Sequence, residues 1–255
     1  MMNHLKKITL LITVFSLFFI VSCGSDDEAS VDLSEVEFAF DASNPPIDQT
    51  VINNLNNSGD PNALQISSNL TSANAMTTWI SLFNQTSGAE ESNVPIGTCG
   101  GNAVVYTYSY GSGDQSFTVA YQICEESNKY IFQIFFSQNG STPALFIYAE
   151  QSKTANEGFM EIYGSAIGVS EVETVPVITY TWEENTDGSF LFTVSDSDGG
   201  FMISIVVNDD NSGELSYTID GNLYYEATWN ADGTAGTYAY YDDEGNETES
   251  GNWPS

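Results

Sequence analysis

Apolar and polar residues alternate along most of the chain from Asn102 to its end. A period of about two residues is typical of strands that bury one face. Clusters such as Asn139-Gly140 and Asp187-Gly188 interrupt the alternation at short intervals and favour tight turns. The pattern therefore predicts strands at 102–110, 115–124, 129–137, 143–151, 157–164, 175–184, 188–195, 200–208, 213–220, 222–230, 234–241 and 247–253.

Residues 46–86 follow a different pattern, with apolar residues at helical spacing. Asp60 followed by Pro61 is a good helix start, because an aspartate caps free backbone N–H groups and proline suits the first helical position. Two or three short helices are expected here.

Short turns join only antiparallel neighbours. The sequence therefore predicts a mainly β fold: a single large antiparallel β-meander of about 10–12 strands. Such a sheet either stays open and curved or closes into an up-and-down barrel. The open sheet is favoured, because the helices of residues 46–86 need a surface on which to pack.

The N-terminus has the pattern of a lipoprotein signal peptide. Lys6 and Lys7 precede an apolar run that ends at Ser22-Cys23, and this run is shorter than the roughly 20 apolar residues of a membrane-spanning helix. Cleavage by an ordinary secretory signal peptidase would leave Cys23 as an odd thiol in an oxidising compartment. The expected organisation is a signal peptide (1–22), a palmitate-bearing Cys23 that opens an acidic tether (23–45), and one folded domain (46–255) with a helical segment (46–86) and a β-meander (102–255).

Composition excludes several classes of function. Beyond the signal peptide the chain has no Arg and no His, and only Lys129 and Lys153 oppose its 35 acidic residues. Histidine-dependent catalytic triads and His-ligated zinc are therefore excluded. A phosphate clamp is also missing, and the negative field repels nucleotides and nucleic acids. No cofactor is expected, apart from calcium on oxygen ligands.

Cys99 and Cys124 form an even pair in an exported chain, which predicts a disulfide. A hairpin turning at 111–114 would place them almost opposite each other, within about two residues of the strand register. Val104, Tyr106 and Tyr121 would share one face, with both cysteines on the other. We expect a cross-strand disulfide that stabilises the hairpin base by about 2–4 kcal/mol. A redox role is not expected without a CxxC motif.

Three groups of residues are candidates for chemistry. Aspartate-rich loops could supply calcium ligands at Asp196, Asp198, Asp209 and Asp210, although they lack the full calcium-loop pattern and also suit plain turns. Strand carboxylates could form a glycosidase pair, namely Glu150, Glu161, Glu183 and Glu226. The alternation of faces along the strands predicts that three further residues point away from the core and could form a shallow binding face, namely Tyr224, Glu226 and Tyr241.

Several segments carry a resemblance to a known group. Gly24-Ser25-Asp26-Asp27-Glu28 follows Cys23, the helical region contains Asn57-Ser58-Gly59-Asp60-Pro61, and the meander ends in Trp229-Asn230-Ala231-Asp232-Gly233 and Gly251-Asn252-Trp253. The chain resembles uncharacterised Bacteroidota lipoproteins of the flavobacterial type. The resemblance implies an outer-membrane lipid anchor, at the cell surface or on the periplasmic face, and brings no catalytic residues.

Three functions remain open. The first is a non-enzymatic envelope protein that binds a glycan, a peptide or an envelope partner through its sheet. The second is a carrier of a lipid or another hydrophobic ligand, with a tunnel lined by Phe132, Ile134, Phe136 and Phe146. The third is a carboxylate-based glycoside hydrolase.

Overall fold

The protein is described by a computed structural model that covers residues 32–38, 45, 47–80, 83, 88–111, 116–164 and 175–253. The predicted signal peptide, Cys23 and most of the predicted tether lie outside these residues. The structure therefore bears on the body that begins at Leu33.

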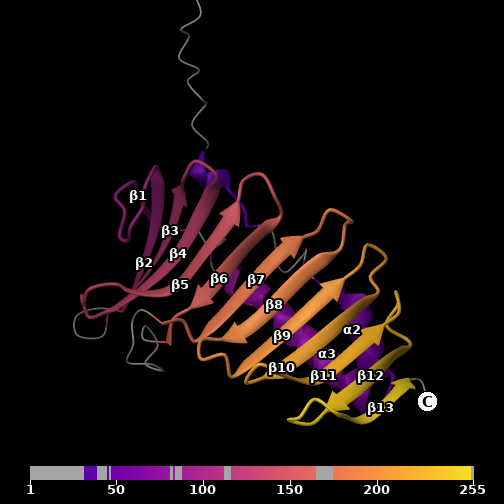
Figure 1. The fold of residues 1–255 in the computed structure, drawn as a ribbon. Helices are drawn as coiled ribbons and strands as arrows, with labels where there is room; N and C mark the ends of the chain where they lie inside the picture. The colour runs from indigo at the N-terminus through magenta and orange to yellow at the C-terminus, as the bar shows by residue number, and fades with distance from the viewer. Residues whose placement is uncertain are drawn as a thin grey trace, which may run out of the picture. The chain divides into compact units, whose positions relative to one another are not determined.

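The body contains one antiparallel sheet in which each strand pairs with its neighbours in sequence (Figure 1). The first and last strands do not pair with each other, so the sheet is open and the favoured alternative is confirmed. Every predicted strand is present, with ends that shift by at most three residues. These strands are β2 (Ala103–Tyr110), β3 (Phe117–Glu125), β4 (Lys129–Gln138), β5 (Ala144–Ser152), β6 (Glu157–Ile162), β7 (Ile178–Glu184), β8 (Phe190–Asp196), β9 (Phe201–Val207), β10 (Gly213–Ile219), β11 (Asn222–Trp229), β12 (Gly236–Tyr241) and β13 (Glu247–Trp253).

A further strand, β1 (Glu90–Ser92), was not predicted. All three of its residues are exposed, so it has no alternation of apolar and polar positions. Pairing with β2 alone defines it, with Glu90 opposite Thr107.

The predicted helical segment forms α2 (Gln49–Asn57), α3 (Pro61–Asn74) and α4 (Met76–Ile80). Asp60 caps α3 as predicted, because its carboxylate accepts hydrogen bonds from the backbone N–H groups of Asn62 at 2.8 Å and Ala63 at 3.4 Å. The helices α2 and α3 lie along one face of the sheet (Figure 1). We call this the inner face and the opposite one the outer face.

Side chains tie the helices to the C-terminal strands. The Asn54 side chain donates to the backbone carbonyl of Asp232 at 2.8 Å, and the Tyr240 hydroxyl donates to the Asn62 side chain at 3.1 Å. Apolar residues of α2 and α3, including Leu55 and Ile66, are fully buried in the same core as the inner-face residues of the sheet. The helices therefore cover the inner face and leave the outer face free.

The packed body reaches back into the segment assigned to the acidic tether. A short 3-10 helix, η1 (Leu33–Glu35), buries Leu33. Phe38 is also buried, and its ring centroid lies 4.9 Å from that of Phe132 and 5.3 Å from that of Trp182. These two apolar residues join the core because the inner face extends beyond the area that the predicted helices cover.

The Cys99–Cys124 disulfide is present, with a Cα–Cα distance of 5.8 Å. Its predicted cross-strand position was wrong. The β2–β3 register pairs Tyr110 with Phe117 and Ala103 with Cys124, so Cys99 lies four residues before the partner of Cys124 and not almost opposite it. The chain turns back at Gly101, where a Cβ would stand 2.1 Å from the carbonyl oxygen of Glu125.

The predicted face assignment of this hairpin is confirmed. Val104, Tyr106 and Tyr121 belong to the main core on the inner face. On the outer face, Val105, Ala120 and Phe135 form a small separate apolar cluster with Leu145 packed against it. The segment before β2 covers part of this cluster, since the backbone of Gly97 approaches the Phe135 ring closely.

Candidate functional site

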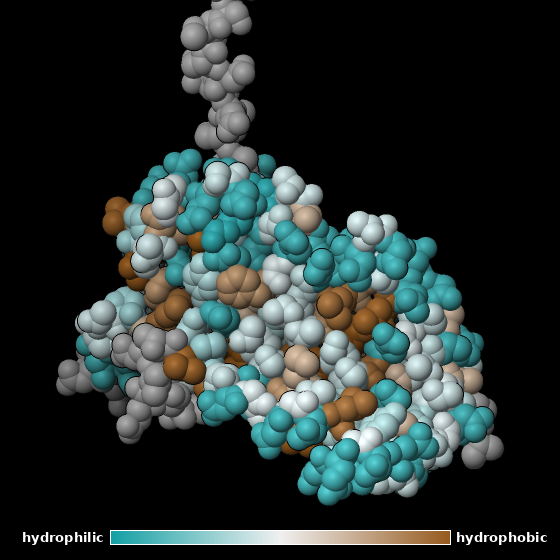
Figure 2. Space-filling model, in the orientation of Figure 1, coloured by the Kyte–Doolittle hydropathy of each residue, from teal (hydrophilic) through white to brown (hydrophobic). Residues whose placement is uncertain are grey.

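The outer face is mostly hydrophilic, with separate apolar patches between the polar residues (Figure 2). A hollow of about 410 Å³ lies on it where β4 to β8 run side by side. We call it the outer hollow. Its lining residues are Asn128, Lys129, Glu150, Ser152, Glu157, Gly158, Phe159, Thr181, Trp182, Glu183 and Leu191.

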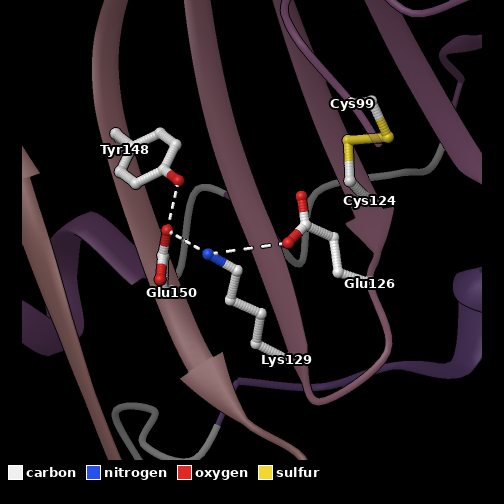
Figure 3. Close-up of polar contacts among 6 residues, drawn as sticks. All are labelled: Cys99, Cys124, Glu126, Lys129, Tyr148 and Glu150. Atoms are coloured by element: carbon white, nitrogen blue, oxygen red, sulfur yellow. Dashed lines mark hydrogen bonds and ion pairs between the residues drawn. A yellow bond between two sulfur atoms is a disulfide. The ribbon is translucent and has the colours of Figure 1, made fainter. Parts of the chain in front are cut away.

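One rim of the outer hollow is an ion-pair network centred on Lys129 (Figure 3). The Lys129 Nζ lies 2.7 Å from Glu150 Oε1 and 3.6 Å from Glu126 Oε2. The Tyr148 hydroxyl also donates to Glu150 Oε1. Lys129 begins β4 and Glu150 lies on β5, so the antiparallel register brings these residues together.

The pKa values of both hydrogen-bond donors in this network, Lys129 and Tyr148, are raised. The hydrogen bond to Glu150 raises the pKa of Lys129. Burial, followed by the hydrogen bond to Glu150, raises the pKa of Tyr148 well above its usual range. At neutral pH the ammonium and the phenol are therefore both protonated and both held on one carboxylate.

The second lysine of the described residues, Lys153, is also paired. Lys153 Nζ lies 2.7 Å from Glu125 Oε1 and 5.0 Å from the centroid of the Tyr130 ring. Tyr130 packs against the main core, so this pair belongs to the inner side of the same sheet end. The two lysines are thus both neutralised near the ends of β3, β4 and β5.

The opposite rim of the outer hollow carries two carboxylates. Glu157 on β6 and Glu183 on β7 are direct cross-strand partners and both are exposed. Like charges in such positions repel each other. The structure gives them no cationic partner among the described residues, because both described lysines are engaged elsewhere.

Apolar side chains lie in the middle of the hollow, on β6, and at its far side, on β8. Phe159 is the cross-strand partner of Glu150 and of Thr181, and its ring centroid lies 5.9 Å from that of Tyr148. Leu191 is the partner of Glu183. The hollow therefore combines an apolar middle, a cationic donor on one side and carboxylate acceptors on the other.

Three of the four predicted strand carboxylates meet in this region. Glu150 and Glu183 line the outer hollow. Glu161 lies beside it as the cross-strand partner of Tyr148, and it accepts a hydrogen bond of 2.6 Å from the Tyr163 hydroxyl. The fourth, Glu226, lies on β11 and lines a second hollow of about 250 Å³ over β9 to β12.

The structure brings two residues of the predicted shallow binding face together, Tyr241 and Glu226, and separates Tyr224 from them. Tyr241 donates a hydrogen bond to Glu226, and this bond raises the pKa of Tyr241 to about 12. Tyr224 is the extra residue at a register shift between β10 and β11. Its ring centroid lies 6.0 Å from that of Tyr217 and 6.1 Å from that of Tyr240, both of which pack on the core. The bulge turns Tyr224 away from Glu226, because an extra residue breaks the alternation of faces.

The four calcium candidates lie in two turns at opposite ends of the sheet, because consecutive connections of a meander alternate between its ends. Asp196 accepts from the backbone N–H of Phe201 at 3.0 Å. Asp210 accepts from Ser212 N at 3.0 Å and from Ser212 Oγ at 2.6 Å, and these bonds lower its pKa. Asp198 and Asp209 occupy exposed turn positions next to these two. In the part of the chain that the structure describes, no three His, Cys, Asp or Glu residues are grouped to hold a metal ion.

The sequence pattern did not single out Lys129, Phe159 and Leu191, which line the hollow, or Tyr148, which donates to Glu150. Each lies in a predicted strand, but the position of a residue within a strand does not show which side chains face it on the adjacent strands. Turn length alone would not have found them, because a register shift between Ile134 and Phe135 sets which residues of β5 share a face with Lys129.

The comparisons with known proteins add no family. No protein-family model and no curated protein matches the chain. Within the described ranges, no helix is both long enough and apolar enough to cross a membrane.

Proposed function

We propose that this protein is a lipid-anchored envelope protein without enzymatic activity that binds a glycan in the outer hollow. The observation that carries the proposal is the hollow itself: Phe159 and Leu191 line it together with hydrogen-bonding groups, on a sheet face that the helices leave free. The lipoprotein signal ending at Cys23 supports the envelope location.

The mixture of side chains suits a sugar. A sugar ring presents apolar C–H faces, which pack on aromatic and aliphatic side chains, and hydroxyl groups around its edge. Phe159 and Leu191 supply the apolar contact. Asn128, Lys129 and Ser152 supply hydrogen-bond donors, and the carboxylates supply acceptors.

Charge narrows the class of glycan. The formal net charge of the chain is −31, and Glu157 and Glu183 occupy one rim of the hollow without a cationic partner among the described residues. Acidic polysaccharides would be repelled by this field. Neutral glycans, or glycans that carry amino groups, are therefore the expected ligands.

The packing of the inner face does not favour the carrier hypothesis. Phe132, Ile134 and Phe146 are each at most 2% exposed. Phe38 packs against Phe132, and Trp79 packs against Phe146 with ring centroids 5.6 Å apart. The side chains that were expected to line a tunnel instead contact other core residues.

Glycan binding is tested with the purified lipidated chain in detergent, on an array of neutral, amino-bearing and acidic glycans. Binding to neutral or amino-bearing glycans is expected, with an affinity loss of about tenfold or more in a Phe159→Ala variant, which corresponds to about 1.4 kcal/mol. Thr228→Ala in the second hollow is the matched control and should bind like the unaltered chain. Equal binding by the Phe159→Ala variant would contradict the assignment of the site.

The same glycans test the hydrolase alternative, which Glu150, Glu157 and Glu183 around one hollow keep open. Bound glycans should be recovered intact after long incubation. Cleaved products that vanish in a Glu183→Gln variant would replace the binding hypothesis with a hydrolytic one.

The lipid anchor is tested in cells. Labelled palmitate should be incorporated into the unaltered chain and not into a Cys23→Ala variant, and globomycin should block cleavage of the signal peptide. Incorporation into both forms would refute lipidation at Cys23.

A further inference from the structure

The two edges of the sheet differ in length. At one edge β1 has three residues, and the segment after it is held to the outer face by the Cys99–Cys124 disulfide. At the other edge β13 has seven residues and pairs only with β12 (Figure 1). Among the described residues, nothing pairs with the far side of β13.

A free edge of this length is a template for another strand. Its outward backbone N–H and C=O groups have no ladder partner, and natural sheets usually shorten, cover or charge such an edge. We propose that β13 is a docking edge for an extended basic segment of a partner protein, which pairs with it as an additional strand. Peptide recognition by strand addition takes its affinity from main-chain hydrogen bonds and its specificity from alternate side chains.

The edge is held in an extended form before any partner binds. Trp253, at the end of β13, is 1% exposed and belongs to the main core. Its ring atoms approach Gly236 of β12, with Cζ2 at 2.3 Å from the place of a Cβ. A partner strand would therefore meet a preformed edge, and the entropic cost of ordering β13 would not reduce the affinity.

Carboxylates lie on both faces of this edge. Glu247 pairs with Tyr241, which points to Glu226 on the outer face. Glu249 pairs with Tyr240 and accepts a hydrogen bond of 3.4 Å from the Tyr238 hydroxyl on the inner side. An incoming strand would thus be flanked by a negative charge on either side, and cross-strand pairs of opposite charge stabilise such a pairing.

The same carboxylates disfavour a second copy of this chain. An antiparallel pair of β13 strands centred on Glu249 would set Glu249 against itself, and like charges in that position are destabilising. The copy would bring no compensating cation, since Lys129 and Lys153 are both ion-paired near the other end of the strand order. A basic segment of another protein is the occupant that fits.

The probe for this edge is a fluorescein-labelled peptide of alternating Thr and Lys, with an alternating Thr and Glu peptide as its control. Fluorescence anisotropy with the full chain should show binding of the basic peptide only, weakened by added salt. A Glu247→Gln/Glu249→Gln variant should lose about tenfold or more in affinity. Glu214→Gln, an exposed position on the outer face of β10, is the matched control and should leave affinity unchanged.

Hydrogen exchange distinguishes strand addition from general attraction to an acidic surface. The backbone amides of β13 should become protected when the basic peptide binds. Absence of binding, binding without protection of β13, or equal affinity of the Glu247→Gln/Glu249→Gln variant would each overturn the proposal. The test is independent of the glycan site, because Phe159→Ala should leave peptide binding and β13 protection unchanged.

Discussion

Trp229 lies opposite Gly213 in the β10–β11 ladder, and its Cζ2 atom stands 2.3 Å from the position that a Cβ on residue 213 would take. The indole therefore lies across the glycine, where any side chain would displace it. An aromatic ring over a strand glycine replaces the packing that the missing side chain would supply. The pairing recurs twice in the sheet, with Trp182 over Gly158 and Trp253 over Gly236.

Replacing this glycine should disturb the core. We expect Gly213→Ala to lower the free energy of unfolding by about 1–3 kcal/mol, because the new methyl group overlaps the Trp229 ring and the Val206 carbonyl oxygen. Urea denaturation measures the change. Ser216→Ala in the same strand, on the outer face, should shift the midpoint little, and an unchanged midpoint in Gly213→Ala would contradict the packing described.

The disulfide should stabilise the segment that covers the outer face of β2 to β4. Ile96 N donates to the Gln122 side chain at 2.7 Å, beside the Cys99–Cys124 bond. A Cys99→Ser/Cys124→Ser variant should lose about 2–4 kcal/mol of stability, with faster hydrogen exchange at Ile96. The matched control is the unaltered chain with reductant, which should behave in the same way. An unchanged exchange rate at Ile96 would show that the disulfide does not hold this segment.

Tyr241 should titrate above its usual value because of Glu226. The folded pKa is raised from 10.0 to about 12, so the stabilisation from this hydrogen bond is present below pH 10 and is lost as pH rises through the folded pKa. In a Glu226→Gln variant the pKa of Tyr241 should fall toward 10.0. Nuclear magnetic resonance of the Tyr241 ring carbon measures it, with Glu214→Gln as the control. A pKa that stays near 12 in the Glu226→Gln variant would contradict the contact.

Asp210 should make the turn between β9 and β10 sensitive to acid. Hydrogen bonds from Ser212 lower the pKa of Asp210 below 3.8. The stabilisation is therefore present above that value and is lost as pH falls through the folded pKa.

The Ser212→Ala variant tests this turn. It should raise the pKa of Asp210 and flatten the loss of stability in acid. Asp187 and Asp232, which accept the same bonds from Ser189 and Thr234, are internal controls and should not shift. An Asp210 pKa that is the same in the variant would show that Ser212 does not set it.

The alternation and the turn residues were sufficient to predict the strands from β2 to β13, because each hairpin is a local event joined by a short connection. The cap at Asp60 and the pairing of Cys99 with Cys124 were predictable for similar reasons. Capping depends on adjacent residues, and an even pair of cysteines in a chain with a predicted export signal is expected to form a disulfide.

Only the tertiary structure decided which side chains meet across strands. One extra residue moved Tyr224 off the face of Glu226, and a wider β2–β3 turn moved Cys99 out of register with Cys124. The outer hollow depends on the register of every strand pair from β4 to β8. A shift by one residue in one of these pairs would move Lys129, Glu150 or Phe159 to the other face of the sheet. The sequence by itself determined the strands and the acidic, histidine-free chemistry of the chain beyond residue 22. The open sheet and its free outer face followed from long-range packing, because the helices and Phe38 cover the inner face and nothing local specifies that contact.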